Sequence, residues 1–327
     1  MKKNQFVFAC AAIAALVTAG IFLLSLTIGR YPISWEAVMT DAIAARVFLT
    51  LRLPRTCMAL IAGFALGIAG CVYQVVFQNP LASPDIIGVA SGSCAGAAFA
   101  ILSFGGGIFA TAGFAFTGGL IAVAVALTLT ALSRRRGMLT LILSGIVVNA
   151  LSQSLLMLMK LTADPERELA SIEFWTMGSF ADITMRKFVS VLPVVFFGLI
   201  GLFLLCRQIL LLGLNEEDAL MLGVSVTSMR RIVLSLATLI TAAVISVTGM
   251  ISFIGLLAPH IARLLARTNH SITVTLSGFV GGCLLLLADI LARSIASTEI
   301  PISILTSLLG GPFLFWLMCR GKEENHG

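Results

Sequence analysis

The stretch Ile232–Ala262, IVLSLATLITAAVISVTGMISFIGLLAPHIA, determines how many times this chain can cross a membrane. It contains no Asp, Glu, Lys or Arg. A helix needs about 20 apolar residues to span a bilayer, so the stretch is long for one crossing and short for two. Gly249 and Pro259 interrupt it, and apolar sequence continues to Leu265. A break near Gly249 gives two spans, and an unbroken stretch gives one.

The composition of the whole chain places it in lipid. Of its 327 residues, 59% are hydrophobic and 11% are charged, whereas a soluble domain carries roughly 25% charged residues. The seven cysteines are scattered without C-x-x-C spacing, which indicates packed thiols and neither a zinc site nor a disulfide framework. We therefore predict an all-α, polytopic membrane protein that forms one transmembrane domain over residues 1–327, with no nucleic-acid partner.

The other candidate spans are runs without charged residues. The first run, residues 4–29, is too long for the apolar region of a cleaved signal peptide, so we interpret it as a transmembrane helix that is retained in the protein. The run 86–133 is long enough for two helices, and Gly105, Gly106 and Gly107 lie near its middle. The remaining runs are 56–84, 137–159, 188–206, 271–288 and 300–319. The total is ten spans if the chain breaks near Gly249, and nine if it does not.

The distribution of basic residues favours ten spans. With a cytoplasmic amino terminus, ten spans put 12 of the 21 Lys and Arg residues inside, and nine spans reverse the ratio. Cytoplasmic loops of membrane proteins carry the excess of Lys and Arg. We therefore predict ten spans with both termini cytoplasmic.

The longest predicted cytoplasmic loop, residues 213–231, has helical signals of its own. Asn215 is a good N-cap residue, acidic residues follow in the first turn, and Gly223 is a good C-cap. Ser225 then begins a second short helix that leads to Arg230 and Arg231. The exposed Leu and Met residues of the first helix need a cover, which is either the protein's own inner surface or a partner.

Polar residues on and within the predicted spans have two interpretations each. Arg52, Arg55 and Arg293 form either a cationic outer rim or ordinary interfacial arginines, and Asp289 could pair with Arg293. Residues Asn149, Ser152 and Gln153 either bond between helices or line a wet path. Residue types and spacing alone favour the ordinary interpretation for the arginines and, slightly, for the amides.

Several motifs together resemble one family, the FecCD-type permeases of type II ATP-binding-cassette importers of ferric siderophores, haem or cobalamin. The blocks run in the family's order across nearly the whole chain. They are Arg52–Arg55, Asn79–Pro84, Leu222–Val224, Gly249–Leu256, Pro259–Arg263, Ala288–Arg293, Glu299–Pro301 and Gly310–Phe313. Departures from the family pattern are Gln78 in place of Arg, Ser303 in place of Gly, and the segment Ala266–Thr268.

The resemblance implies a role for each candidate group. The cytoplasmic loop would couple to an ATPase partner, through Asn215, Glu216, Glu217, Asp218, Ala219, Leu222, Gly223 and Val224. The arginines Arg52, Arg55 and Arg293 would meet carboxylates of a substrate-binding protein. The residues Asn149, Ser152 and Gln153 would line the path between two permease subunits, which are two copies or two paralogues.

The expected function is therefore a permease subunit in the bacterial inner membrane that carries a metal chelate, first of all a ferric siderophore. Haem, cobalamin or an oxyanion are alternative cargoes. The chain has no G-x-x-x-x-G-K-[ST] phosphate loop, so ATP would be used by the partner. We expect no catalytic residue, no metal site and no cofactor. An ion-coupled carrier is a remote alternative, because no charged residue lies in the middle of a predicted span.

Overall fold

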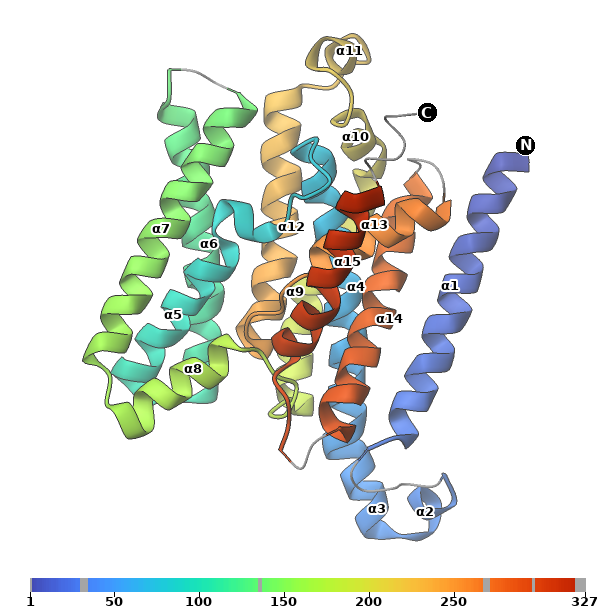
Figure 1. Cartoon of the computed structure of the whole chain (residues 1–327), viewed down its shortest axis with the longest axis vertical. Helices are drawn as coiled ribbons and strands as arrows, with labels where there is room; N and C mark the ends of the chain where they lie inside the picture. Colours follow the sequence, from blue (N-terminus) through green and yellow to red (C-terminus); the bar gives the residue numbers. More distant parts are fainter. Residues whose placement is uncertain (1, 30–34, 135–136, 267–270, 296–297, 321–327) are drawn as a thin grey trace.

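The computed structural model is an all-helical bundle (Figure 1). It describes residues 2–29, 35–134, 137–266, 271–295 and 298–320. Within these ranges, seven helices are long and apolar enough to cross a membrane and three shorter ones are apolar, which together make ten. The ten are α1 (Lys2–Thr27), α4 (Leu53–Val76), α5 (Val89–Phe104), α6 (Ile108–Leu132), α7 (Met138–Thr162), α9 (Met185–Leu204), α12 (Val226–Thr248), α13 (Ile254–Ala266), α14 (Ser271–Ser294) and α15 (Ile302–Arg320).

The predicted break near Gly249 is confirmed. Helix α12 ends at Thr248, and Gly249 follows with φ +70°, a left-handed conformation that glycine adopts without steric cost. A Cβ at Gly249 would lie 2.2 Å from the carbonyl oxygen of Trp175, so the close packing also requires glycine. The chain stays non-helical to Phe253, which has φ +66°, and then enters α13. One charge-free stretch therefore forms two helices joined by an unwound segment, residues 249–253.

The predicted division of the run 86–133 is also confirmed, whereas the expectation for Ser225 is wrong. Gly105 ends α5 at φ +66°. Helix α4 ends at Val76, and the chain that follows contains Asn79-Pro80, which cannot continue the helical hydrogen bonds. Ser225 begins no separate short helix. It is the N-cap residue of α12, which continues without a break into the bundle.

Short helices join the long ones, most of them at the two ends of the bundle. They are α2 (Trp35–Thr40), α3 (Ala42–Val47), the π-helix η1 (Phe48–Arg52), the 3₁₀-helix η2 (Pro84–Ile87), the π-helix η3 (Pro165–Leu169), α8 (Ala170–Thr176), α10 (Cys206–Leu211) and α11 (Glu216–Met221). Figure 1 shows α11 at the end where α1 begins and α15 ends, and α2, α3 and α8 at the opposite end. We call these two ends the α11 end and the α8 end.

Helix α4 lies at the centre of the bundle and packs against α12, α13 and α14. Its glycines allow this close packing. A Cβ at Gly63 would lie 2.3 Å from the carbonyl oxygen of Gly281, and a Cβ at Gly70 would lie 1.7 Å from that of Gly255. Small residues bring helix backbones together where lipid supplies no hydrophobic driving force between helices. The glycines of α4 therefore fix the positions of α13 and α14.

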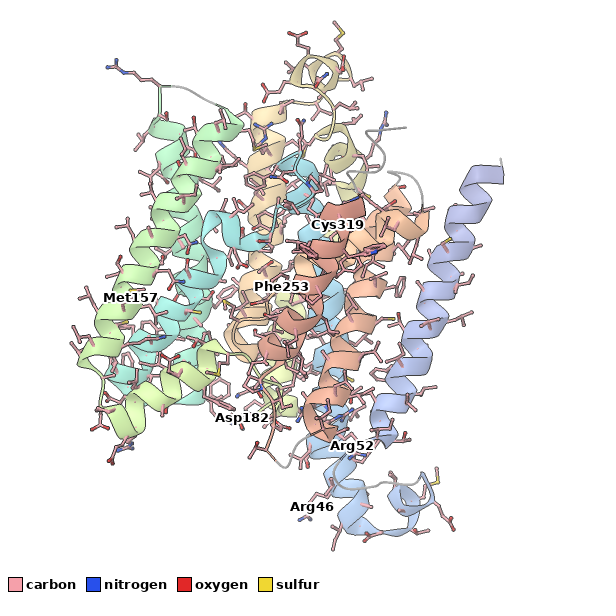
Figure 2. All side chains as sticks on the ribbon, viewed as in Figure 1. Arg46, Arg52, Met157, Asp182, Phe253 and Cys319 are labelled. Carbon is pink, nitrogen blue, oxygen red and sulfur yellow. The ribbon has the colours of Figure 1, made fainter. Side chains whose placement is uncertain are left out.

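The outer helices present large apolar side chains. On α7, Met157 is 66% exposed and points away from the bundle (Figure 2), and Leu143, Leu151 and Leu158 are also exposed. Soluble monomers rarely leave contiguous apolar surface of this extent uncovered. A bilayer, or another membrane-embedded chain, must cover it.

Candidate functional site

Helix α11 forms a small projection at one end of the bundle (Figure 1). Asn215 occupies its N-cap position, although its side chain makes no capping hydrogen bond. At the other end, Gly223 has φ +81° and the Val224 amide donates to the Ala219 carbonyl at 3.0 Å. These two features end a helix with a left-handed glycine, so the predicted C-terminal role of Gly223 is confirmed.

The surface of α11 is apolar at its far end. Leu220 is 59% exposed, Met221 is 88% exposed and Leu222 is 58% exposed. Ala219 is buried and Glu216 forms an ion pair of 3.1 Å with Arg230 of α12, so the helix is fastened by one face only. Its other acidic residues, Glu217 and Asp218, are exposed. The protein's own surface therefore does not cover the apolar face, and the first alternative of the sequence analysis is wrong.

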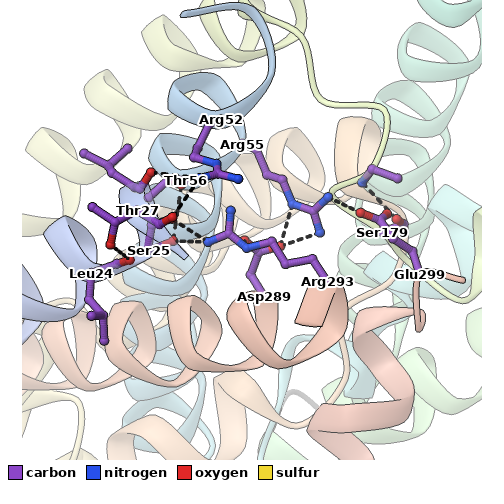
Figure 3. Close-up of polar contacts among 12 residues, drawn as sticks. Leu24, Ser25, Thr27, Arg52, Arg55, Thr56, Ser179, Asp289, Arg293 and Glu299 are labelled. Atoms are coloured by element: carbon purple, nitrogen blue, oxygen red, sulfur yellow. Dashed lines mark hydrogen bonds and ion pairs between the residues drawn. The ribbon is translucent and has the colours of Figure 1, made fainter. Parts of the chain in front are cut away.

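The three arginines lie together at the α8 end of the bundle, where α3, η1 and α4 make one continuous helix (Figure 3). Arg52 donates to the carbonyl oxygens of Leu26 and Thr27, at 3.3 and 2.9 Å. Arg293 donates to the carbonyl and the hydroxyl of Ser25, at 2.7 and 2.6 Å. Both guanidinium groups therefore cap the end of α1.

Acidic residues hold the third arginine. Arg55 donates to Asp289 at 2.8 Å and forms a second ion pair with Glu299. Asp289 is fully buried and also lies 3.6 Å from Nε of Arg293, which is the pairing that their spacing allowed. Charge-assisted hydrogen bonds of this kind are stronger than neutral ones. The network of Arg52, Arg55, Asp289, Arg293 and Glu299, here called the arginine cluster, thus joins α1, α4, α14 and the segment before α15.

The arginine cluster faces the interior and does not form an open rim. Arg52 is 7% exposed and Arg293 is 5% exposed. A role of these side chains in docking stays a prediction. Any carboxylate from a partner would meet guanidinium groups that already have partners.

The three candidate path residues of α7 point in different directions. Gln153 lines a cavity of about 660 Å³ between α7, α8, α15 and the unwound segment. Ser152 is buried, and Asn149 is half-buried with its backbone close to Gly88. Of the three, only Gln153 is placed to contact a molecule in this cavity, and the roles of all three as path lining stay predictions.

Apolar side chains and a few hydroxyl groups form the wall of the cavity that Gln153 lines. Ser252 and Met250 come from the unwound segment, and Ser303 and Ser307 come from α15. The Ser303 hydroxyl donates to the Met250 carbonyl at 2.6 Å, a bond that glycine at this position could not make. The cavity is therefore mainly apolar, with a few hydroxyl groups and the single charged side chain of Lys160 in its lining. Its shape depends on how α15 is attached to the unwound segment.

Sequence reasoning missed one further carboxylate. Asp85 in η2 lines a cavity of about 210 Å³ with Ser83, Ser252 and Phe253, and Figure 2 shows Phe253 at mid-height in the bundle. The sequence signal was a single acidic residue between the charge-free runs 56–84 and 86–133. Nothing in the sequence shows that the segment after α4 turns back into the bundle. In the described part of the chain, no group of three or more His, Cys, Asp or Glu could hold a metal ion.

Comparison with known proteins connects this geometry to one family. The profile of the FecCD transport family matches residues 16–320. The molybdate import system permease protein MolB of Haemophilus influenzae is 36% identical over 320 residues, covering 92% of each chain. The hemin transport system permease protein HmuU of Yersinia pestis is 33% identical over 333 residues, covering 98% of this chain and 96% of that protein. The Fe(3+) dicitrate transport system permease protein FecD of Escherichia coli is 35% identical over 315 residues, covering 93% of this chain and 96% of that protein.

A solved structure shares the whole fold. It is described as an inward-facing conformation of a metal-chelate type ABC transporter, and it superposes with a TM-score of 0.88 at 34% sequence identity. The match covers 97% of this chain and 99% of that one. The arrangement of the ten helices is therefore that of a transporter subunit.

Proposed function

The chain belongs to the FecCD transport family, and from that premise we propose that it carries a ferric siderophore through a path that it forms with a second permease subunit. It is a multi-pass permease subunit of a metal-chelate ABC importer, so an ATPase subunit hydrolyses ATP and a binding protein delivers the cargo. The permease itself is not catalytic and carries no cofactor. The ten helices would act as one transmembrane domain.

The observation that carries the proposal is the uncovered apolar face of α11. Leu220, Met221 and Leu222 are exposed on a helix that stands outside the bundle. An ATPase cleft that accepts this helix would bury these side chains, and burial of each large apolar side chain contributes about 1.5–3 kcal/mol. We propose that residues 213–231 form the coupling loop. The α11 end, with both chain termini, would then be cytoplasmic, as the excess of basic residues indicates.

The cavity lined by Gln153 supports the assignment of the path. It opens on the side of the bundle formed by α7 and α15, whose apolar side chains are exposed, so a second permease subunit packed there would close it. We propose that the partner is a second copy or a paralogue. Asn149, Ser152 and Gln153 remain the proposed lining residues on α7, and Gln153 would be the first to contact cargo.

The choice of cargo rests on the relatives. FecD and the ferric enterobactin transport system permease protein FepG of Escherichia coli, which is 34% identical over 332 residues, are named for ferric chelates. A cavity with hydroxyl groups and few charges suits a large chelate that needs only weak contacts, because the binding protein selects it. The similarity to MolB favours an oxyanion as the second candidate.

Uptake into proteoliposomes tests the proposed function. The chain is reconstituted with its ATPase and its binding protein, and uptake of a ⁵⁵Fe-labelled ferric siderophore is compared with that of haem, cobalamin and molybdate. We expect ATP-dependent uptake of the ferric siderophore. Uptake that persists without ATP while an ion gradient is held would refute the importer. ATP-dependent uptake of molybdate alone would refute the assigned cargo and leave the importer standing.

A further inference from the structure

Two glutamines lie one helical turn apart where α4 reaches the α11 end of the bundle. Gln74 is in the last turn of α4 and is 4% exposed. Gln78 follows the end of α4 and has φ +47°, an uncommon backbone conformation for a residue other than glycine. Such conformations persist where surrounding contacts hold them. The contacts of the two side chains lead in opposite directions.

Gln78 holds the chain that leads into α11. Its Nε2 donates to the carbonyl oxygens of Leu212 and Leu214, at 3.3 and 2.8 Å. Leu214 directly precedes Asn215, the N-cap residue of α11. One amide group therefore grips the approach to α11 through two backbone atoms, so the attachment depends on the geometry of the backbone and not on the side chains of the loop.

Gln74 holds α13. Its Nε2 donates to the carbonyl oxygen of Leu256, at 3.2 Å, and its Oε1 accepts a hydrogen bond from Arg263. Leu256 is in the first turn of α13 and Arg263 is in its last turn. A single buried amide thus bonds to both ends of the helix that follows the unwound segment 249–253.

Between these contacts, α4 and α13 touch along their backbones. A Cβ at Gly70 would lie 1.7 Å from the carbonyl oxygen of Gly255. Packing this close leaves no room for the two helices to move independently. A displacement of α4 at this level would therefore move α13, and with it the unwound segment and the cavity wall formed by Ser252.

We propose that Gln78 and Gln74 form an amide relay that passes the movement of α11 through α4 to α13 and the unwound segment. The relay rests on the proposed coupling function of α11. Both glutamines are positioning residues, because their hydrogen bonds go to backbone carbonyl oxygens and to Arg263 of the same chain. The family's usual arginine in place of Gln78 also donates hydrogen bonds, so the feature that matters is a donor aimed at the carbonyl oxygens of Leu212 and Leu214.

Substitution Gln78→Glu tests the relay with almost no change of shape. It replaces the donor by a carboxylate that faces two carbonyl oxygens. We expect the amount of cargo transported per ATP hydrolysed to fall about tenfold, since two hydrogen bonds are lost and each contributes a factor of several to an equilibrium constant. The complex with the ATPase should still form, because the exposed face of α11 is unchanged.

Two variants serve as controls in the same reconstituted complex. Gln78→Arg keeps a hydrogen-bond donor at this position, so transport per ATP should stay within about twofold of the wild type. Gln208→Met removes a glutamine amide on α10, whose buried Oε1 has no hydrogen-bond partner among the described residues, so its loss should cost little. It should also stay within about twofold. Equal transport per ATP in Gln78→Glu, Gln78→Arg and the wild type would overturn the relay while the importer stands.

A second pair of substitutions, made singly and together, keeps the test decisive if Gln78→Glu does not fold. Gln78→Met fills the same space without a donor, and Gln74→Leu removes the contact with α13. If both residues act in one relay, the double variant should lose no more coupling than the stronger single variant. Losses that multiply would show two independent contacts and overturn the relay. Absence of ATP-dependent uptake by the wild type would instead refute the proposed function.

Discussion

The two ends of the bundle are held together by different chemistry. At the α8 end, the arginine cluster combines three guanidinium groups and two carboxylates, most of them buried. At the α11 end, the amides of Gln74 and Gln78 bond mainly to backbone carbonyl oxygens, and the Glu216–Arg230 ion pair has an exposed carboxylate. Breaking a buried ion pair costs about 3–5 kcal/mol, whereas a neutral hydrogen bond contributes about 0.5–1.5 kcal/mol. The comparison suggests a rigid α8 end and a movable α11 end.

Removing the Asp289 carboxylate, at the centre of the arginine cluster, should have the largest effect on the free energy of unfolding. In Asp289→Asn, Arg55 and Arg293 lose a buried counter-ion, and breaking such a pair costs about 3–5 kcal/mol. Unfolding in mixed micelles, followed against SDS concentration, measures the loss. The control Glu173→Gln breaks the half-exposed pair with Lys160, which should cost at most about 1 kcal/mol. Equal losses in the two variants would contradict a rigid α8 end.

A proline at position 223 should impair the coupling of α11 to ATP hydrolysis more than it lowers the stability of the whole protein. Gly223 has φ +81°, whereas proline requires about −65°, and its amide donates to the Leu220 carbonyl at 2.9 Å. Gly223→Pro should cost about 3 kcal/mol locally and abolish binding-protein stimulation of ATP hydrolysis. Gly223→Asn, which tolerates a positive φ, should keep most of the stimulation. Normal stimulation in the proline variant would refute α11 as the coupling helix.

A methyl group added at the contact between α4 and α13 should have an intermediate effect on stability. Gly70→Ala places a methyl group against the Gly255 backbone and should destabilise the protein by about 1–3 kcal/mol through separation of α4 and α13. Gly20→Ala in α1 meets no atom within 4 Å and should be neutral or stabilising by up to about 1 kcal/mol. Mixed-micelle unfolding of both variants measures the difference. If Gly70→Ala unfolds like Gly20→Ala, α4 and α13 are not in rigid contact.

The smallest effect concerns docking at the α8 end. Glu299→Gln removes one of the two carboxylates that occupy Arg55. If Arg52, Arg55 and Arg293 receive carboxylates of the binding protein, this variant should bind it a few-fold more tightly, a difference of about 1 kcal/mol. Surface plasmon resonance with the permease in nanodiscs measures the affinity. Unchanged or weaker binding would count against docking at the arginine cluster.

The sequence was sufficient to predict the bundle but not the contacts within it. Charge-free runs and glycines located ten helices and the break at Gly249, because backbone hydrogen bonding in lipid leaves few alternatives. The same signals missed η2, where Asp85 returns into the bundle. They could not show that Arg55 turns towards Asp289 and Glu299, since these residues lie 234 and 244 positions away. Long-range pairing of this kind leaves no periodic pattern in a single sequence.

At the candidate site, the sequence predicted local backbone features well, but it did not predict in which direction each side chain points. The turn at Gly223 followed from the need for a residue that tolerates positive φ, and the apolar face of α11 followed from its residue types. On α7, Ser152 and Gln153 are neighbours, yet one is buried and the other lines a cavity. Their difference depends on how α7 rotates against α5 and η2, which only the packed structure determines.

The sequence separation within the arginine cluster has a consequence for biosynthesis. Arg55 leaves the ribosome 234 residues before Asp289, a delay on the order of ten to fifty seconds at usual rates of translation. Throughout that interval a cation near the lipid boundary has neither of its two acidic partners. We therefore expect the nascent chain to keep this part of α4 at the water interface, or against the insertion machinery, until the last quarter of the protein has been synthesised.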